Sequence, residues 1–410
     1  MNSMFSEYKG LPREIYVLFT ANVINRFGDF VSPLLALYLT QKLSMDAATT
    51  SLIVTLALLS RMPGAYLGGK MADHFGRRIT YLITQTIAGL TLLPCAFLNN
   101  HYIIIILLIV STFFNGAVRP ALDALVIDLM PKEKRKLGLS LMYLGINIGV
   151  AVGPALAGIL FKVNLKLFFL VDVVTSLIAV LLVLTLIKAS QEILDDGSTS
   201  VNEAMAKEGS IISLFKTRKT LMRFLLLTSC FSMIYIQTKF ALPLLFSHEF
   251  GENGSALLGM LFSINAITVI LCTSFVTYKT KSNPTAINVT IAGLLYAVGF
   301  GLYGLVTGYP LYVLATIVWT IGEILMFINI KSYVADHTPV NYRGRVNALS
   351  QMLNAAMKSF GVLLSGRLIP ALGHSAIWLL VFGACLIISS LIYLENRNEI
   401  NRKSLGQKTA

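Results

Sequence analysis

Apolar runs of close to twenty residues recur along the whole of this chain of 410 residues. A helix that rises 1.5 Å per residue needs about twenty residues to cross about 30 Å of hydrocarbon. Hydrophobic residues make up 55% of the chain and charged residues 13%, whereas about a quarter of the residues of soluble domains are charged. The sequence therefore predicts an all-α integral membrane protein.

Turn-forming and polar residues divide the apolar sequence into twelve expected transmembrane helices. Examples of these breaks are Asn99–Asn100, Gly251–Gly254 and Gly308–Pro310. Such residues end helices or form the turns between them. The expected spans cover residues 15–40, 48–68, 79–98, 103–127, 138–161, 166–187, 222–246, 255–277, 285–307, 310–334, 346–369 and 375–394.

Lysine and arginine residues predict which side of the membrane each loop faces. If both termini are cytoplasmic, the inner segments hold 23 of these residues and the outer loops four, Lys42, Lys162, Lys166 and Arg367. Cytoplasmic loops carry such an excess of positive charge. We therefore expect a multi-pass protein of the cell membrane with cytoplasmic termini. The net charge of +13 then faces the anionic lipid bilayer, and its spread over short loops argues against a nucleic-acid partner.

An internal repeat predicts two six-helix halves. The pattern of Val126–Arg135 recurs in Val334–Arg343, at an offset of 208 residues. We expect an N-terminal half over 1–188, a linker over 189–221, a C-terminal half over 222–395 and a tail over 396–410. The end of the linker, residues 211–219, has the pattern of an amphipathic helix at the membrane interface. Two such halves are typical of transporters that bind substrate between them at mid-membrane.

The connection after the second span carries the motif Gly69-Lys-Met-Ala-Asp73-His-Phe-Gly76-Arg77-Arg78. Gly69 and Gly76 would allow a close backbone approach and a tight turn. The motif resembles the signature loop of the major facilitator superfamily, except that His74 replaces the more usual basic residue. The resemblance implies that Asp73, Arg77 and Asp128 latch the cytoplasmic side in the outward-facing state. The alternative is an ordinary basic loop that only sets the topology. The second half's counterpart, near Thr277–Pro284, lacks the glycines and the acid.

The fifth span carries small residues on one face. Glycines at every fourth residue let a partner helix approach closely, and a proline among them would kink the helix. The pattern resembles the antiporter motif of proton-driven drug exporters, which implies export; generic helix packing is the alternative. The residues are Gly145, Gly149, Gly153, Pro154 and Gly158.

Charged residues inside the spans are candidates for proton coupling, because each is costly in hydrocarbon. Glu323 has no lysine or arginine within one helical turn, which suits a group that binds and releases a proton in every cycle. The surrounding sequence resembles that of twelve-helix proton–multidrug antiporters. In the alternative, a lysine of another helix, such as Lys239 or Lys358, holds Glu323 in a structural role. The further candidates are Asp29 and Asp123, each with an arginine nearby (Arg26 and Arg119). Asp172 is expected to have a structural role, and the side chain of Arg61 could extend to a membrane boundary.

Aromatic, polar and flexible side chains in the spans could line a promiscuous pocket. Helix packing is the alternative for each of them. The fifth span has no carboxylate at its middle, which removes one reason to expect a preference for lipophilic cations. The candidates are Tyr143, Asn147, Tyr235, Gln237, Lys239, Phe240, Met260, Phe262 and Trp319.

The chain carries no P-loop, zinc-protease motif, nucleophile elbow or dinucleotide fingerprint, so we expect neither an enzyme nor ATP-driven transport. No cofactor or metal is expected, and a proton gradient would supply the energy. The resemblance implies a monomeric, proton-coupled exporter of lipophilic drugs or small amphiphiles. One alternative is a carrier dedicated to a single metabolite, lipid or peptide, with Lys239 and Arg119 binding an anionic group. Another is a sensor built on a transporter fold.

Overall fold

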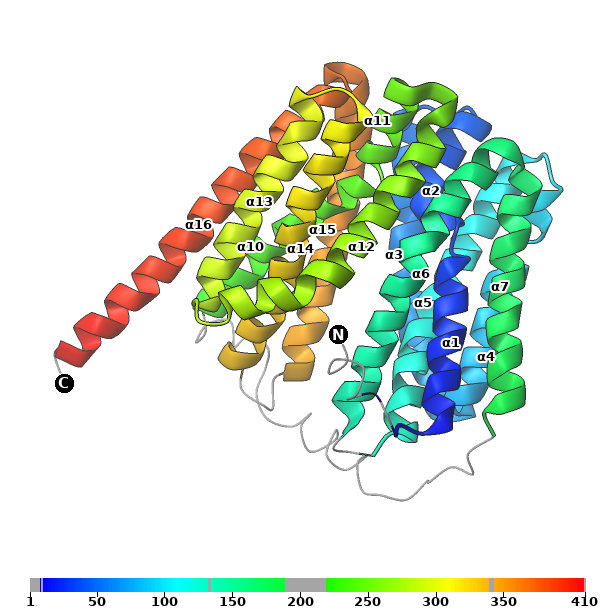
Figure 1. Ribbon diagram of the computed structural model, residues 1–410, viewed down its shortest axis with the longest axis horizontal. Coiled ribbons are helices and arrows are strands. Elements are labelled where there is room, and N and C mark those ends of the chain that lie inside the picture. The colour runs from blue at the N-terminus through cyan, green and yellow to red at the C-terminus, as the bar shows by residue number, and fades with distance from the viewer. Residues whose placement is uncertain (1–7, 9, 132–133, 189–218, 339–342, 409–410) are drawn as a thin grey trace. The chain divides into compact units, whose positions relative to one another are not determined.

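The structure, a computed structural model, describes residues 8, 10–131, 134–188, 219–338 and 343–408. All regular elements in these ranges are helical (Figure 1). The helices are α1 (Arg13–Phe27), α2 (Val31–Leu37), α3 (Ala47–Phe75), α4 (Arg77–Leu90), α5 (His101–Leu129), α6 (Arg135–Val163), α7 (Leu165–Leu186), α10 (Lys219–Tyr235), α11 (Ala241–Phe250), α12 (Gly254–Thr280), α13 (Thr285–Leu305), α14 (Tyr309–His337), α15 (Arg343–Leu372) and α16 (His374–Lys408). Short helical turns are η2 (Tyr38–Lys42), η3 (Pro94–Ala96), η5 (Ile236–Thr238) and η6 (Gly251–Asn253).

The helices account for the predicted membrane spans. Ten helical stretches in the described residues are long and apolar enough to cross a bilayer. One of them, Lys219–Thr280, is 62 residues long and contains two of the predicted spans, while the first predicted span is divided into α1 and α2. The prediction of an all-α integral membrane protein is thereby confirmed.

Contacts divide the chain into two compact units. The first unit comprises residues 1–192 and 242–267, and the second comprises 193–241 and 268–410. The predicted boundaries of two sequential halves stay a prediction. The predicted interfacial helix of the linker lies almost entirely outside the described residues. At the other end of the chain α16 continues to Lys408, beyond the predicted end of the last span at residue 394.

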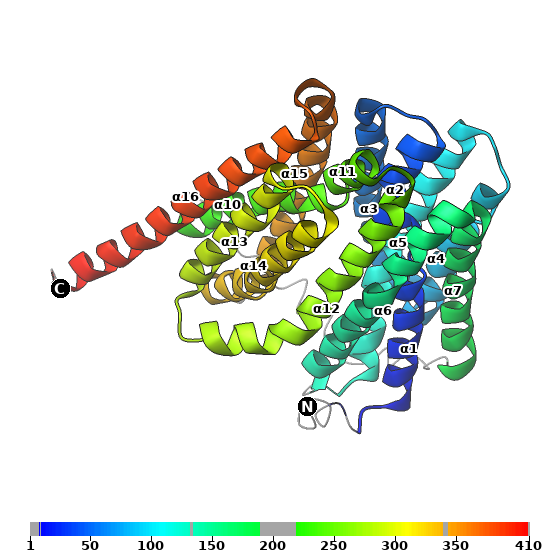
Figure 2. The same ribbon diagram turned by 45° about the horizontal axis from the view of Figure 1, so that its top comes forward.

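In the first unit α1 packs against α6 and α7, and α3 packs against α5. Figure 2 shows α1 beside α6, with α7 and α5 close by. Small residues permit these contacts. A Cβ atom at Gly64 would strike the carbonyl of Phe113, and one at Gly116 would strike the backbone of Arg61. Glycine is therefore required where α3 and α5 meet.

In the second unit α13 packs against α14 and α16. Aromatic rings fill the space between these helices. The ring of Phe300 stacks on Trp319 at 5.2 Å and on Trp378 at 5.9 Å between centroids. Tyr303 packs against Trp378 at 5.0 Å. Large rings bury much apolar area, so this cluster holds the three helices together.

Candidate transport site

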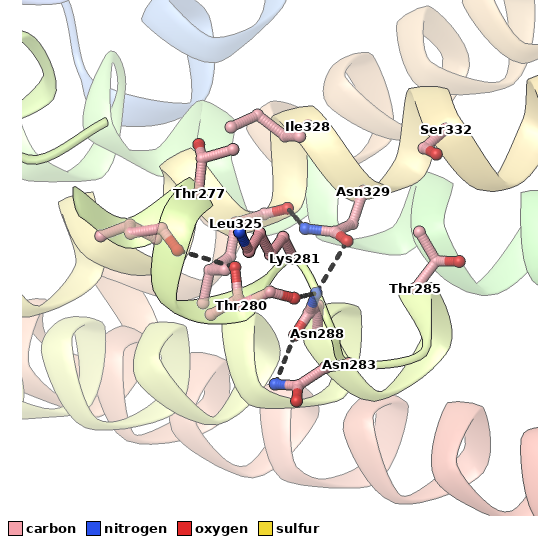
Figure 3. A pocket seen from close by; sticks show the side chains of 11 residues that line it. Thr277, Thr280, Lys281, Asn283, Thr285, Asn288, Leu325, Ile328, Asn329 and Ser332 are labelled. Carbon is pink, nitrogen blue, oxygen red and sulfur yellow. Dashed lines mark hydrogen bonds between the residues drawn. The ribbon is translucent and has the colours of Figure 1, made fainter. Parts of the chain in front are cut away.

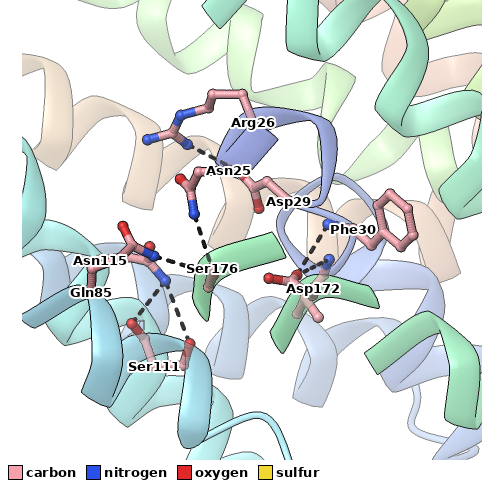
Figure 4. Close-up of polar contacts among 10 residues, drawn as sticks. Asn25, Arg26, Asp29, Phe30, Gln85, Ser111, Asn115, Asp172 and Ser176 are labelled. Carbon is pink, nitrogen blue, oxygen red and sulfur yellow. Dashed lines mark hydrogen bonds and ion pairs between the residues drawn. The ribbon is translucent and has the colours of Figure 1, made fainter. Parts of the chain in front are cut away.

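The first span is broken at its middle, between α1 and α2. The backbone N–H groups of Phe30 and Val31 donate to the buried carboxylate of Asp172 on α7, at 3.1 and 3.3 Å (Figure 4). A carboxylate at a helix N-terminus satisfies N–H groups that have no partner within the helix. Asp172 thus stabilises the break, and this contact gives it the structural role expected from the sequence.

Both aspartates proposed for proton coupling in the first unit are paired within their own segments. Arg26 Nη1 lies 3.0 Å from Asp29 Oδ2, and Arg119 Nε lies 2.9 Å from Asp123 Oδ2. Arg119 and Asp123 lie four residues apart on one face of α5, whereas Asp29 lies in the break after α1, three residues beyond Arg26. Because an arginine compensates its charge, each aspartate is a poor candidate for a group that binds a proton during the transport cycle.

A polar network that sequence analysis missed joins α1, α4 and α7. The amides of Asn25 and Gln85 both donate to Ser176 Oγ, each at 3.2 Å (Figure 4). Below it Asn115 Nδ2 donates to the Ser111 carbonyl at 3.1 Å. Hydrogen bonds between polar side chains hold membrane helices together. Asn25, Gln85 and Ser176 belong to three different spans, so only the packing of the helices brings them together.

Glu323 on α14 lies beside Tyr235, at the end of α10. The Tyr235 hydroxyl donates to Glu323 Oε1 at 2.7 Å, and the Tyr235 ring packs edge-on against Trp319 with 6.1 Å between centroids. All three residues belong to the second unit. The structure therefore brings together one predicted coupling residue and two predicted lining residues.

The other predicted lining residues differ in exposure. Tyr143 is exposed and accepts a hydrogen bond from Asn147 through its carbonyl, at 2.9 Å. Lys239 is also exposed. Phe240 and Trp319 are fully buried, and Trp319 Nε1 donates to the Tyr303 hydroxyl at 3.0 Å. Gln237 is buried and donates to the Gly361 carbonyl at 3.1 Å. Phe262 is buried too, whereas Met260 is exposed.

The predicted latch residues lie where α3 and α4 join. Arg77 and Asp128 form an ion pair, and Asp73 acts on Arg77 electrostatically. Gly76 joins the helices with φ of +85°, a conformation that favours glycine. Arg78 Nη2 donates to the Leu184 carbonyl at 2.8 Å.

The close backbone approach predicted at Gly69 is wrong. A Cβ atom built at Gly69 would meet no atom within 4 Å. Gly69 lies inside α3, which continues to Phe75, so the chain turns only after the helix ends. The turn requirement belongs to Gly76 alone.

The small residues of α6 pack against two other helices, α1 and α12. Gly145 faces the ring of Phe19, and Cβ atoms at Gly149 and Gly153 would strike the backbone of Phe27. At the other end of this face, a Cβ at Gly158 would strike the Ser255 carbonyl, and Ser255 Oγ donates to the Gly158 carbonyl at 2.9 Å. The glycine-rich segment thus packs against α1 and against the start of α12, within the first unit.

A polar pocket of about 250 Å³ lies where α12, α13 and α14 meet (Figure 3). Asn288 Nδ2 donates to Asn329 Oδ1 at 3.0 Å, and Asn283 Nδ2 donates to Asn288 Oδ1 at 3.1 Å. Lys281 lies on its wall, and none of the residues that line it is acidic. The connection between α12 and α13, which sequence analysis names as the counterpart of the latch loop, forms part of this pocket.

Comparison with known proteins decides the family. Residues 18–362 match the family model described as Major Facilitator Superfamily. The chain belongs to the Major Facilitator Superfamily. An uncharacterized MFS-type transporter of Bacillus subtilis (strain 168), YqjV, is 26% identical over 336 residues that cover 80% of each protein. A Na(+), Li(+), K(+)/H(+) antiporter of Planococcus maritimus is 20% identical over 390 residues, covering 89% of this chain and 91% of the antiporter.

The fold is also that of solved transporters. A crystal structure of the peptide transporter POT in complex with sulfate is similar with a TM-score of 0.78 at 16% identity, covering 95% of this chain and 96% of the other. Membership of the Major Facilitator Superfamily makes this multi-pass membrane protein a secondary transporter and not an enzyme. The alternative of a non-transporting sensor has no support among these relatives.

Proposed function

We propose that the chain is a proton-coupled antiporter that exports small amphiphilic molecules and that Glu323 carries the proton. The observation that carries this proposal is the 2.7 Å hydrogen bond from the Tyr235 hydroxyl to Glu323 Oε1. A hydroxyl can donate to an ionised carboxylate and can accept from a protonated one. The contact between these two side chains therefore survives both states of a carboxyl group that gains and loses a proton.

The aspartates of the first unit lack this property. Arginine carries a fixed positive charge and has donors but no acceptor, so the partners of Asp29 and Asp123 favour the ionised carboxylates. Protonation of either aspartate would leave a guanidinium without its counter-charge in the membrane, which is costly. Glu323 is accordingly the preferred proton carrier, with Asp29, Asp123 and Arg119 in supporting electrostatic roles.

The resemblance of α6 to the antiporter motif supports export, and so does the similarity to a cation/proton antiporter. Close packing at Gly149 and Gly153 brings α6 against α1, the helix that ends at the charged pair of Arg26 and Asp29. Movement of α1 against α6 would then change the surroundings of that pair. The motif would in this way couple the packing of α1 against α6 to the charges of Arg26 and Asp29 during the transport cycle.

We further propose that Asp73, Arg77 and Asp128 latch the cytoplasmic side, in a monomer whose termini are both cytoplasmic. The Arg77–Asp128 ion pair joins the start of α4 to the end of α5. An ion pair at the end of two helices can form in one conformation and separate in another at small cost, because exposed pairs contribute little to stability. Such a pair suits a contact that must open once in every cycle.

The experiment places purified protein in liposomes that contain a pH-sensitive dye, under an imposed pH gradient. Lipophilic cations, zwitterions and organic anions are added in turn. Proton movement that depends on one of these compounds, and that is absent from protein-free liposomes, is the expected result. Uptake or release of a compound without any proton movement would contradict the antiporter proposal.

A further inference from the structure

Arg61 occupies the middle of α3, which spans Ala47–Phe75. Its side chain is exposed and lies within electrostatic range of Arg26 and Asp29. The backbone of Arg61 packs against Gly116 of α5, so this part of α3 faces other helices. We call Arg26, Asp29 and Arg61 the Arg61 cluster. All three residues belong to the first unit.

The carboxylates near this cluster are already engaged. Asp29 pairs with Arg26 at 3.0 Å, and Asp123 pairs with Arg119 at 2.9 Å. Asp172 accepts the backbone N–H groups at the start of α2. Within the described residues, Arg61 makes no ion pair with any of them. Asp172 lies within electrostatic range of Arg26 and Asp29 as well, so what marks the cluster is that Arg61 has no carboxylate of its own among the described residues.

Unused hydrogen-bond donors lie beside this guanidinium group that has no ion-pair partner. The Nε atom of Arg26 is buried and has no hydrogen-bond partner within the described residues. A guanidinium group has five N–H donors, and Arg26 uses one of them on Asp29. Burial of a donor without an acceptor is costly, and so is a cation in the middle of a membrane span. A bound anion would relieve both costs.

We propose that the Arg61 cluster binds the carboxylate group of an amphiphilic organic anion, which makes anionic amphiphiles the substrate class. The inference rests on the proposed function, because it names the substrate of that transporter. Arginine forms bidentate hydrogen bonds to carboxylates and stays charged at every relevant pH. Arg61 therefore recognises the substrate without taking up or releasing the transported proton. The apolar remainder of the substrate would lie against the surrounding helices.

The Arg61 cluster replaces the anion site expected from the sequence. That expectation used Arg119 and Lys239. The charge of Arg119 is compensated by Asp123, and Lys239 belongs to the second unit. Arg61 is thus an arginine in the middle of a span of the first unit whose charge is available for a ligand.

The test measures equilibrium binding of three fluorescent probes that share one apolar group. Dansylglycine carries a carboxylate, its amide is neutral, and dansylethylenediamine carries an ammonium group. Binding to the purified full chain in nanodiscs is followed by the rise in dansyl fluorescence, with no pH gradient. We expect dansylglycine to bind at least about tenfold more tightly than its amide, the difference that a charge-assisted hydrogen bond makes. The ammonium probe should bind most weakly.

Three variants assign the preference to the cluster. Arg61→Gln should abolish the preference for dansylglycine over the amide, and Arg61→Lys should retain part of it. Lys166→Gln removes one positive charge from the same unit at the exposed start of α7, and it should leave the preference unchanged. The comparison of three probes on the unaltered chain needs no variant, so a variant that fails to fold does not remove the test.

Equal binding of dansylglycine and its amide would overturn the inference, as would an unchanged preference in Arg61→Gln or no binding by any probe. These outcomes are distinct from failure of the proposed function. Proton coupling through Glu323 is measured by proton movement in liposomes, and it can hold for a cationic or neutral substrate. Loss of coupling with an intact carboxylate preference would reject the antiporter and keep the anion site.

Discussion

The carboxylates inside the first unit and Glu323 in the second have partners of different chemistry. Asp29 and Asp123 are paired with arginine at 3.0 and 2.9 Å, whereas Glu323 accepts a hydrogen bond from the neutral hydroxyl of Tyr235 at 2.7 Å. An arginine partner favours only the ionised carboxylate, while a hydroxyl partner suits both protonation states. In the proposed function, the first unit uses its charges for structure and ligand binding, and the second unit uses the carboxyl group of Glu323 for the proton.

The same contrast recurs at one end of each unit. Arg77 and Asp128 form an ion pair near the connection of α3 and α4, whereas an amide network of Asn288 and Asn329 lies near the connection of α12 and α13 (Figure 3). An ion pair loses strength when salt rises, whereas hydrogen bonds between neutral amides do not depend on charge. The two ends therefore respond differently to ionic strength and to charge-removing substitutions.

The largest expected effect is on stability. Asp123→Asn leaves the partly exposed Arg119 guanidinium without its counter-charge inside a membrane span, where an uncompensated charge costs about 2.5 kcal/mol or more. Glu323→Gln keeps a hydrogen-bonding group beside the Tyr235 hydroxyl and should cost less than about 1 kcal/mol. Unfolding in detergent at increasing denaturant measures both. The double variant Arg119→Gln with Asp123→Asn should regain much of the loss, and equal costs for the two single variants would contradict the contrast.

A smaller effect is expected at the latch, and it should appear in transport. Arg77→Gln removes a partly exposed ion pair, so the free energy of unfolding should change by less than about 1 kcal/mol. Transport should fall by about tenfold if the pair contributes about 1.4 kcal/mol to the closed conformation. The matched variant Asn288→Ala should lower stability by a similar amount and leave transport unchanged. A transport loss in Asn288→Ala as large as that in Arg77→Gln would show that both ends gate.

The smallest effect is expected from Tyr235→Phe. This variant keeps the ring beside Trp319 and removes the hydroxyl that donates to Glu323. Loss of one hydrogen bond of about 1 kcal/mol should slow proton-coupled transport by about fivefold. Proton movement should persist, because the carboxyl group remains. Complete loss of proton movement would mean that Tyr235 itself passes the proton.

The architecture could be predicted because the bilayer imposes it: apolar runs near twenty residues have few other uses. The sequence did not predict the break in the first span, although Gly28, Asp29 and Pro33 lie in that span. The carboxylate that stabilises the break, that of Asp172, belongs to a distant helix. The ion pairs of Arg26 and Arg119 followed from their helical spacing, whereas no spacing relates Tyr235 to Glu323.

Sequence could not tell which aromatic residues face a substrate. Trp319 and Phe240 were proposed as lining residues, and both are buried among neighbouring helices. The face that a helix presents depends on the packing of its neighbours, and in a nearly uniform apolar span the sequence carries little record of it. The available charge of Arg61 was likewise hidden, because sequence alone could not show that Asp29 pairs with Arg26 and Asp123 with Arg119.

The central claim is that Glu323 exchanges its proton for substrate while the paired aspartates do not. The direct measurement counts the protons released per protein when saturating substrate is added in weakly buffered detergent solution. The account predicts release from the unaltered chain and from Asp29→Asn, and none from Glu323→Gln. Release that persists in Glu323→Gln and disappears in Asp29→Asn would contradict it.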